Sequence, residues 1–198
     1  MNSQNQNFGP DQNLNQRFDQ NYLQNFNQSY PSQFGNQQSQ IEMLAQQFYN
    51  QYNASIQSIQ IGDVNQAEFA LHGATNTIQI LGNQLPPNEF RIFKVMHQQI
   101  ETSFKVAKAI NLYNEERFEK AGFEVASASE ICDAALQSFN QLSMNMMNNY
   151  ELAKMLPIIK NSFLFFKIQI EAYEKMIASE VDKLNNKFTD ELAMLREV

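Results

Sequence analysis

The feature that most constrains the fold is a pattern of small and bulky residues that recurs after fifty-four residues. The stretch GDVNQAEFALHGATNTIQIL covers residues 62–81, and ERFEKAGFEVASASEICDAA covers residues 116–135. Apolar positions recur in steps of three and four, as on one face of an α-helix. Small residues let helices approach closely, so each stretch predicts one helix of a tightly packed hairpin. The matched pairs are Val64 with Phe118, Ala67 with Ala121, Leu71 with Val125, Ala74 with Ala128 and Ile78 with Cys132.

Helical spacing continues over most of the chain beyond about residue 40 and predicts an all-α fold. Gly62 suits the end of one helix and Asp63 the N-cap of the next. No run of residues alternates in the way that would require a β-strand. We therefore expect antiparallel helical hairpins, or a bundle of about five helices, with hairpins at about 40–82 and 88–142. The predicted helices cover about 40–60, 64–82, 88–113, 116–142, a short 149–156 that ends at Pro157, and a long 158–196.

The long C-terminal helix has apolar positions whose average spacing is 3.6 residues over 159–195. A sustained coiled coil would average about 3.5, so a straight amphipathic helix that lies on a bundle fits better. The first half of this helix is apolar nearly all round, which predicts packing on two sides. Its end, DKLNNKFTDELAMLREV, is amphipathic and can extend beyond the bundle.

The N-terminal segment differs in composition from the rest of the chain. Residues 1–40 contain 20 Asn and Gln and only three charged residues. Such a segment cannot bury enough apolar surface to offset the entropy lost on ordering. We expect a disordered, prion-like tail at 1–38 and a helical domain at 39–198. The tail is either a product of compositional drift, an assembly element, or a helix that forms on binding, since five aromatic residues from Phe18 to Phe34 are spaced four apart.

The matched stretches resemble the tetratricopeptide repeat, in which small, bulky and small residues after a turn pack against the preceding helix. The resemblance rests on Gly62 and Asp63 followed by Ala67, Leu71 and Ala74, and on Ala121, Val125 and Ala128 in the second copy. It covers about residues 45–142. The period of fifty-four residues departs from the family's period of about 34, so a plain five-helix bundle remains the alternative. The resemblance implies stacked hairpins that bind other proteins.

Charge and cysteine content exclude several functional classes. The net charge is −7 and only 14 residues are basic, so we expect no nucleic-acid partner. The most apolar run, residues 155–170, is too short and too polar for a membrane-spanning helix, and we expect no membrane partner. Cys132 is the single cysteine, and no secretory signal is visible, so a soluble, cytoplasmic protein is expected.

No residues with the spacing of a catalytic or metal site stand out. His72 and His97 lack Cys, Asp or Glu at metal-ligand spacing, and Cys132 falls on an apolar stripe. Glu115 and Glu116 fit the first turn of a helix better than a pair of catalytic carboxylates. We therefore expect no enzyme activity, no metal and no cofactor.

The remaining hypothesis is a non-catalytic adaptor or scaffold for protein–protein interaction, whose hairpin surface binds a partner helix or peptide. The candidate contacts are Tyr49, Tyr113 and Phe123, although each could equally belong to the core. The alternative is a self-assembling structural subunit, a homo-oligomer that the Asn/Gln-rich tail and the C-terminal helix hold together.

Overall fold

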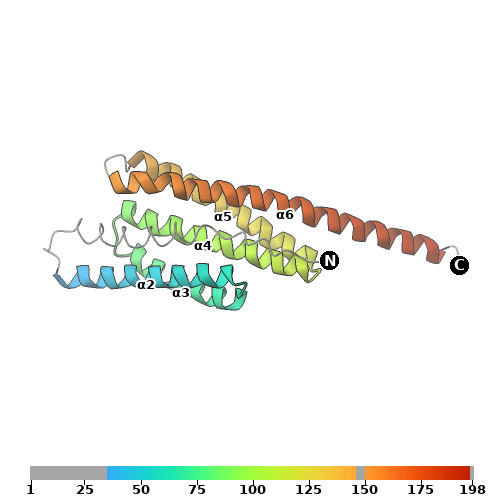
Figure 1. Ribbon diagram of the computed structural model, residues 1–198, viewed down its shortest axis with the longest axis horizontal. Coiled ribbons are helices and arrows are strands. Elements are labelled where there is room, and N and C mark those ends of the chain that lie inside the picture. Colours follow the sequence, from blue (N-terminus) through green and yellow to red (C-terminus); the bar gives the residue numbers. More distant parts are fainter. Residues whose placement is uncertain (1–34, 146–149, 197–198) are drawn as a thin grey trace.

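The computed structural model describes the backbone of residues 35–145 and 150–196 and the side-chain surroundings of 39–142 and 160–189. Five α-helices and no strand occur in these residues, which confirms the all-α prediction (Figure 1). Residues 1–34 of the predicted tail at 1–38 lie outside the described residues. The first described helix begins at residue 35 and thus includes the last four residues of the predicted tail. The helices are α2 (Gly35–Gln60), α3 (Val64–Gly82), α4 (Pro87–Asn114), α5 (Phe118–Asn145) and α6 (Tyr150–Arg196).

The two hairpin turns close with the same hydrogen bonds, fifty-four residues apart. The amide of Asp63 donates to the carbonyl of Ser58 over 2.9 Å, and the amide of Arg117 donates to that of Leu112 over 2.9 Å. The preceding residues, Gly62 and Glu116, are left-handed, with φ of 79° and 59°. This arrangement satisfies the last carbonyls of a helix. The repeat in the sequence is thus a repeat in backbone conformation, with glycine at only one of the two left-handed positions.

Small residues lie where the paired helices cross. Ala67, Ala74, Ala121 and Ala128 are all 0% exposed. They let the hairpin partners approach closely, so that the bulky residues between them interlock. The predicted alternation of small and bulky contacts is therefore found in both hairpins. Asp63 also caps α3 as expected, because its carboxylate accepts a hydrogen bond from the amide of Gln66 over 3.0 Å.

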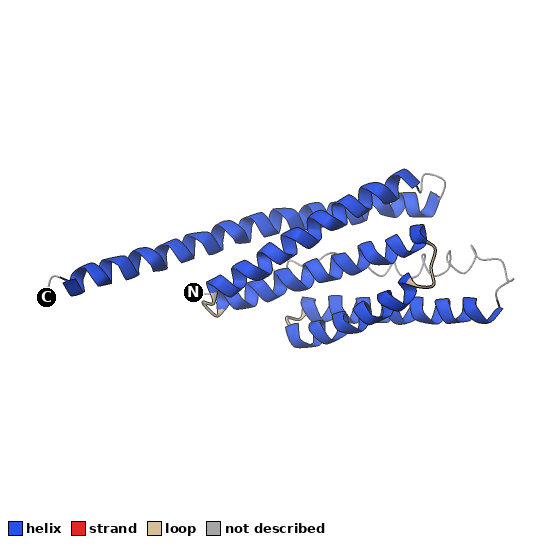
Figure 2. Cartoon of the chain, turned by 180° about the vertical axis from the view of Figure 1, so that it is seen from behind, coloured by secondary structure: helices blue, strands red, loops and turns tan. Residues whose placement is uncertain are grey.

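The order in which the helices pack repeats after two helices. α2 packs on α3 and α4, and α3 packs on α4. In the same way α4 packs on α5 and α6, and α5 packs on α6. α4 therefore lies at the centre of the molecule between the first hairpin and α6, as both views show (Figures 1 and 2). Its largest fully buried residues are Phe93, Val95, Met96, Ile100 and Thr102.

α6 is one continuous helix, so the prediction of a short helix ending at Pro157 was wrong. Proline removes one backbone hydrogen bond at a cost of about 3 kcal/mol. Packing of α6 along α5 outweighs this local preference, as tertiary contacts often do. The stretch SMNMMNN at 143–149 is compatible with a loop or with a weak continuation of the preceding helix; α5 continues to Asn145, and residues 146–149 lie outside the described residues.

The C-terminal part of α6 extends past the other helices, as expected from its amphipathic sequence (Figure 1). All residues from Asp182 to Thr189 are exposed. Among the described residues, no helix combines the length and the hydropathy needed to cross a membrane.

Candidate interaction surface

Tyr49, the first of the three predicted contact residues, lies in the core. Its side chain is 1% exposed. The ring meets Phe48 edge-on with centroids 6.0 Å apart and packs on Phe93 of α4 at 5.9 Å. Tyr49 therefore helps to join α2 to α4, and for this residue the core alternative holds: its ring is not accessible to a partner.

Tyr113 and Phe123 occupy the end of the second hairpin. Tyr113 is half-buried, and its ring packs edge-on against Phe118 across the α4–α5 turn, with centroids 5.3 Å apart. Phe123 is 77% exposed and lies on the side of α5 that faces away from the core. Of the three predicted residues, only Phe123 presents a whole aromatic ring to solvent.

A hollow of about 470 Å³ lies between the α4–α5 turn and α6, and neither Tyr113 nor Phe123 is among the residues that line it. Its apolar lining comes from Phe118, Val181 and Leu184. Phe123 lies one helical turn from Glu119, which lines the rim, so the two side chains share a face of α5. The polar lining residues are Glu116, Arg117, Glu119, Lys120 and Asn185.

The core-facing stripe of α6 continues past this hollow. Ile177 is 6% exposed and Val181 is partly buried, whereas Leu184 is 49% exposed and Phe188 is 69% exposed. These residues follow one another in steps of four, three and four, so they lie on one face of the helix. The bundle ends before the apolar stripe does. We call the hollow together with Phe123, Leu184 and Phe188 the hairpin-end surface.

Phe69 is an exposed aromatic residue that the search for contact residues missed. It is 75% exposed on α3, in the position that corresponds to Phe123 after the shift of fifty-four residues. Aligning the two stretches residue by residue could have found it. Phe69 belongs to the first hairpin and does not line the hollow.

A cluster of ion pairs joins α3 and α5 to the central helix α4. The ammonium group of Lys105 lies 2.7 Å from the carboxylate of Glu124, and that of Lys108 lies 3.1 Å from Glu124 and 3.7 Å from Glu68. Burial alone would raise the pKa of Glu124, but hydrogen bonds from Lys105 and Lys108 outweigh it and lower this pKa. The hydrogen bond to Glu124 in turn raises the pKa of Lys108. Both groups stay charged at neutral pH.

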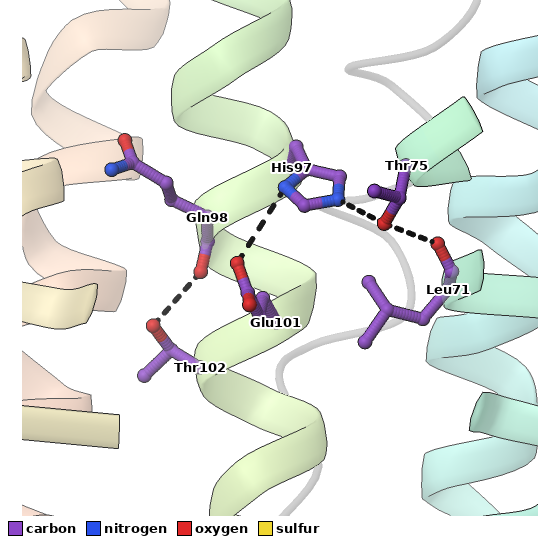
Figure 3. A network of polar contacts seen from close by, with 6 residues as sticks. All are labelled: Leu71, Thr75, His97, Gln98, Glu101 and Thr102. Carbon is purple, nitrogen blue, oxygen red and sulfur yellow. Dashed lines mark hydrogen bonds and ion pairs between the residues drawn. The ribbon is translucent and has the colours of Figure 1, made fainter. Parts of the chain in front are cut away.

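His97 forms a second polar link, between α4 and α3 (Figure 3). The imidazole Nε2 lies 2.8 Å from the hydroxyl of Thr75, and Nδ1 lies 3.6 Å from the carboxylate of Glu101. The Thr75 hydroxyl donates its proton to the carbonyl of Leu71 over 2.9 Å, so it accepts a hydrogen bond from Nε2. Burial lowers the pKa of His97 to about 4, and the ring is neutral at neutral pH.

The Thr75 hydroxyl, the His97 imidazole and the Glu101 carboxylate contact one another in the same order as the groups of a catalytic triad, but the hydrogen bond between the hydroxyl and the imidazole runs in the opposite direction. A nucleophilic hydroxyl must give its proton to the imidazole. Here the Thr75 proton is directed to a carbonyl of its own helix, a common arrangement for threonine in helices. The arrangement therefore connects two helices, and its hydrogen bonds do not activate Thr75.

Cys132 is buried between α5 and α6. Its thiol donates to the carbonyl of Phe163 over 3.4 Å, and burial raises its pKa to about 11. A thiol of this kind is a poor nucleophile at neutral pH. Within the described residues, no group of three or more His, Cys, Asp or Glu side chains is arranged to hold a metal ion.

Comparison with known proteins finds no family model, no curated protein and no solved structure that matches this chain.

Proposed function

We propose that this protein is a non-catalytic adaptor or scaffold that binds a partner protein through the hairpin-end surface. One observation carries the proposal: the apolar stripe of α6 continues beyond the point where the bundle ends. Leu184 and Phe188 are exposed beside a hollow that contains Phe118 and Val181. A soluble chain rarely leaves adjoining apolar side chains and a hollow uncovered without a binding role.

The chemistry of this surface favours a helix or peptide with a row of bulky apolar side chains. Such a segment would place one side chain in the hollow and others along Leu184 and Phe188, as helices in grooves do. The rim contains both signs of charge, with Glu116 and Glu119 near Arg117 and Lys120. It therefore selects a partner by pairing of charges at the edge more than by net charge.

Proximity labelling with the full chain identifies candidate partners, and a binding measurement with the purified partner tests the surface. Phe188→Asp should weaken binding at least tenfold, because it places a charge on the apolar stripe. The matched control is Phe69→Asp, which alters an equally exposed phenylalanine away from the hollow. Equal effects of the two substitutions, or no partner that binds the purified chain, would contradict the proposal.

We also propose that the hairpins form a long-helix variant of the tetratricopeptide arrangement. The support is the order of packing: the first helix of each hairpin, α2 or α4, contacts the second helix of its own hairpin and also the helix that begins the next unit, α4 or α6.

We also propose a cytoplasmic location, because a buried free cysteine suits a reducing compartment. Imaging of the tagged chain tests the location.

A second candidate function is self-assembly through the Asn/Gln-rich tail and α6. The extension of α6 past the bundle favours it, because it offers a long helix for contact with other copies (Figure 2). Light scattering of the full chain and of a chain without residues 1–38 tests the role of the tail. An unchanged particle size would exclude the tail from assembly.

A further inference from the structure

α6 carries two apolar faces, and the bundle covers only one of them. Phe163, Phe166, Ile170 and Ile177 are at most 6% exposed and pack on the bundle. Each residue of a helix turns the side chain by about 100°, which places a second apolar row on the opposite side. We call this row the outer stripe, and it consists of Leu164, Phe165, Ile168, Ala172 and Met176.

The outer stripe is exposed along its whole length. Leu164, Phe165 and Met176 are 43–45% exposed, and Ile168 is 66% exposed. The sequence predicted that this half of the helix packs on two sides, yet in the described part of the chain only α5 and α4 pack on it. α6 lies at the edge of the bundle, with its other side open (Figure 1). The second apolar face therefore lacks a partner within one copy of the described chain.

We propose that the outer stripe is covered by α6 of a second copy of this protein, running antiparallel and crossing at Ala172. A two-fold axis through this point brings Ile168 of each copy against Met176 of the other, because both residues lie four positions from Ala172. The axis itself passes between two alanines, and small side chains there let the helices approach closely. The row is thus complementary to itself when the axis passes at Ala172, the small residue of the stripe.

The charges beside the stripe favour the same arrangement. Glu171 and Lys175 are both exposed on one flank. In an antiparallel pair centred on Ala172, Glu171 of each copy comes near Lys175 of the other, which makes two attractive contacts against one approach of the two Glu171 carboxylates. In a parallel pair in register, this flank of one copy would instead face the opposite flank of the other, so Glu171 and Lys175 would not meet. The charges on this flank therefore favour the antiparallel orientation, because it is the one that brings Glu171 near Lys175.

The position of Ala172 also gives the longest overlap between the two helices. α6 spans Tyr150–Arg196, so Ala172 lies next to its midpoint. An antiparallel crossing at that point aligns the helices over nearly their whole length. The hairpin-end surface stays free, because Leu184 and Phe188 lie on the opposite face of α6. Pairing through the outer stripe is thus independent of the proposed partner binding.

Cysteine cross-linking of the full chain tests the orientation. Ala172→Cys places two thiols at the two-fold axis and should give a disulfide-linked dimer under mild oxidation. Ser179→Cys is the matched control, because Ser179 is exposed on the same face seven residues away. In the antiparallel pair its two copies are separated by about 21 Å along the axis, too far for a disulfide. The native Cys132 is 1% exposed and serves as the background.

Sedimentation of the uncross-linked chain tests the contacts. Ile168→Asp should raise the dissociation constant of the dimer at least tenfold, whereas Phe69→Asp should leave it unchanged. Glu171→Lys should also weaken the dimer, and adding Lys175→Glu should restore it. Circular dichroism confirms that each variant keeps its helices.

The outcomes separate clearly. Cross-linking at both positions would show a parallel pair and overturn the proposal, as would a dimer that Ile168→Asp leaves intact. A chain that stays monomeric, with the stripe bare or covered by its own residues 1–34, would overturn it as well. Loss of partner binding by Phe188→Asp with an intact dimer would leave this inference standing, so the two proposals fail separately.

Discussion

The neutral, buried imidazole of His97 makes a measurable prediction about stability in acid. Its pKa is about 4 in the folded chain and 6.5 when the side chain is free in water. Between these pH values the unfolded chain binds a proton that the folded chain does not bind. The free energy of unfolding therefore falls as the pH falls through this window. One pH unit corresponds to about 1.4 kcal/mol, so the full effect is about 3 kcal/mol, of which about 2.5 kcal/mol falls between pH 7.5 and 4.5.

His97→Gln removes the titrating group while keeping a polar side chain. Denaturation by urea, followed by circular dichroism at constant ionic strength, gives the free energy of unfolding at each pH. The difference between the native chain and the variant should shift by about 2.5 kcal/mol between pH 7.5 and 4.5. Only this change with pH is compared, because loss of the hydrogen bond to Thr75 adds a constant.

Two controls isolate the imidazole. Burial raises the pKa of Glu101, and the charge of Lys105 opposes this rise. The stability that Glu101 contributes is therefore lost as the pH rises, whereas the stability that His97 contributes is lost as the pH falls. Glu101→Gln should therefore leave the acid-side loss of His97 in place. Thr75→Val removes the acceptor and should lower stability at pH 7.5 by about 1 to 2 kcal/mol. Parallel pH profiles for the native chain and His97→Gln, or an NMR titration of His97 near pH 6.5, would refute the reasoning.

Three further tests address the turns, the helix crossings and the ion pairs, each through the free energy of unfolding. Gly62→Ala should lower the free energy of unfolding by about 1 kcal/mol, because φ is 79° at this position and a side chain disfavours a left-handed backbone. Glu116→Gly should leave the free energy of unfolding unchanged or raise it by up to about 1 kcal/mol, because it relieves the same conflict at a φ of 59°. A clear loss for Glu116→Gly would show that its left-handed backbone is unstrained. Ala121→Leu should cost about 2 kcal/mol or more, since Ala121 is 0% exposed at a crossing; a neutral result would mean that the helices are loosely packed. Glu124→Gln should cost about 1 to 2 kcal/mol, and a double-mutant cycle with Lys108→Met should show coupling. An interaction energy near zero would remove Lys108 from the cluster.

The helices and their pairing could be predicted because local preferences and burial agree. Gly62 and Asp63 mark one turn, and Ala67 and Ala121 mark the crossings that the structure places in the core. Pro157 misled the prediction because the local cost of proline in a helix is visible in the sequence, whereas the packing of the remainder of α6 is not.

The surface could be predicted only in part, because the sequence does not show whether a given aromatic residue on a helix points toward the core or toward solvent. Tyr49 and Phe123 both looked like possible contacts, yet one is 1% and the other 77% exposed. The hollow depends on where the α4–α5 turn ends relative to Val181 and Leu184, which are more than sixty residues away in the sequence. No local pattern encodes that distance.

Two polar contacts of α4, those of His97 and Glu124, respond to acid in the same direction. His97 links α4 to α3, and Glu124 links α5 to α4 through two lysines. The pKa of each group is lowered in the folded chain, so each contributes stability that is lost as the pH falls. The apolar crossings within each hairpin contain no such group, and protonation leaves them intact. Acid therefore weakens the contacts of α4 with α3 and α5 at these two polar groups, whereas the buried alanines at the helix crossings carry no group that it can protonate.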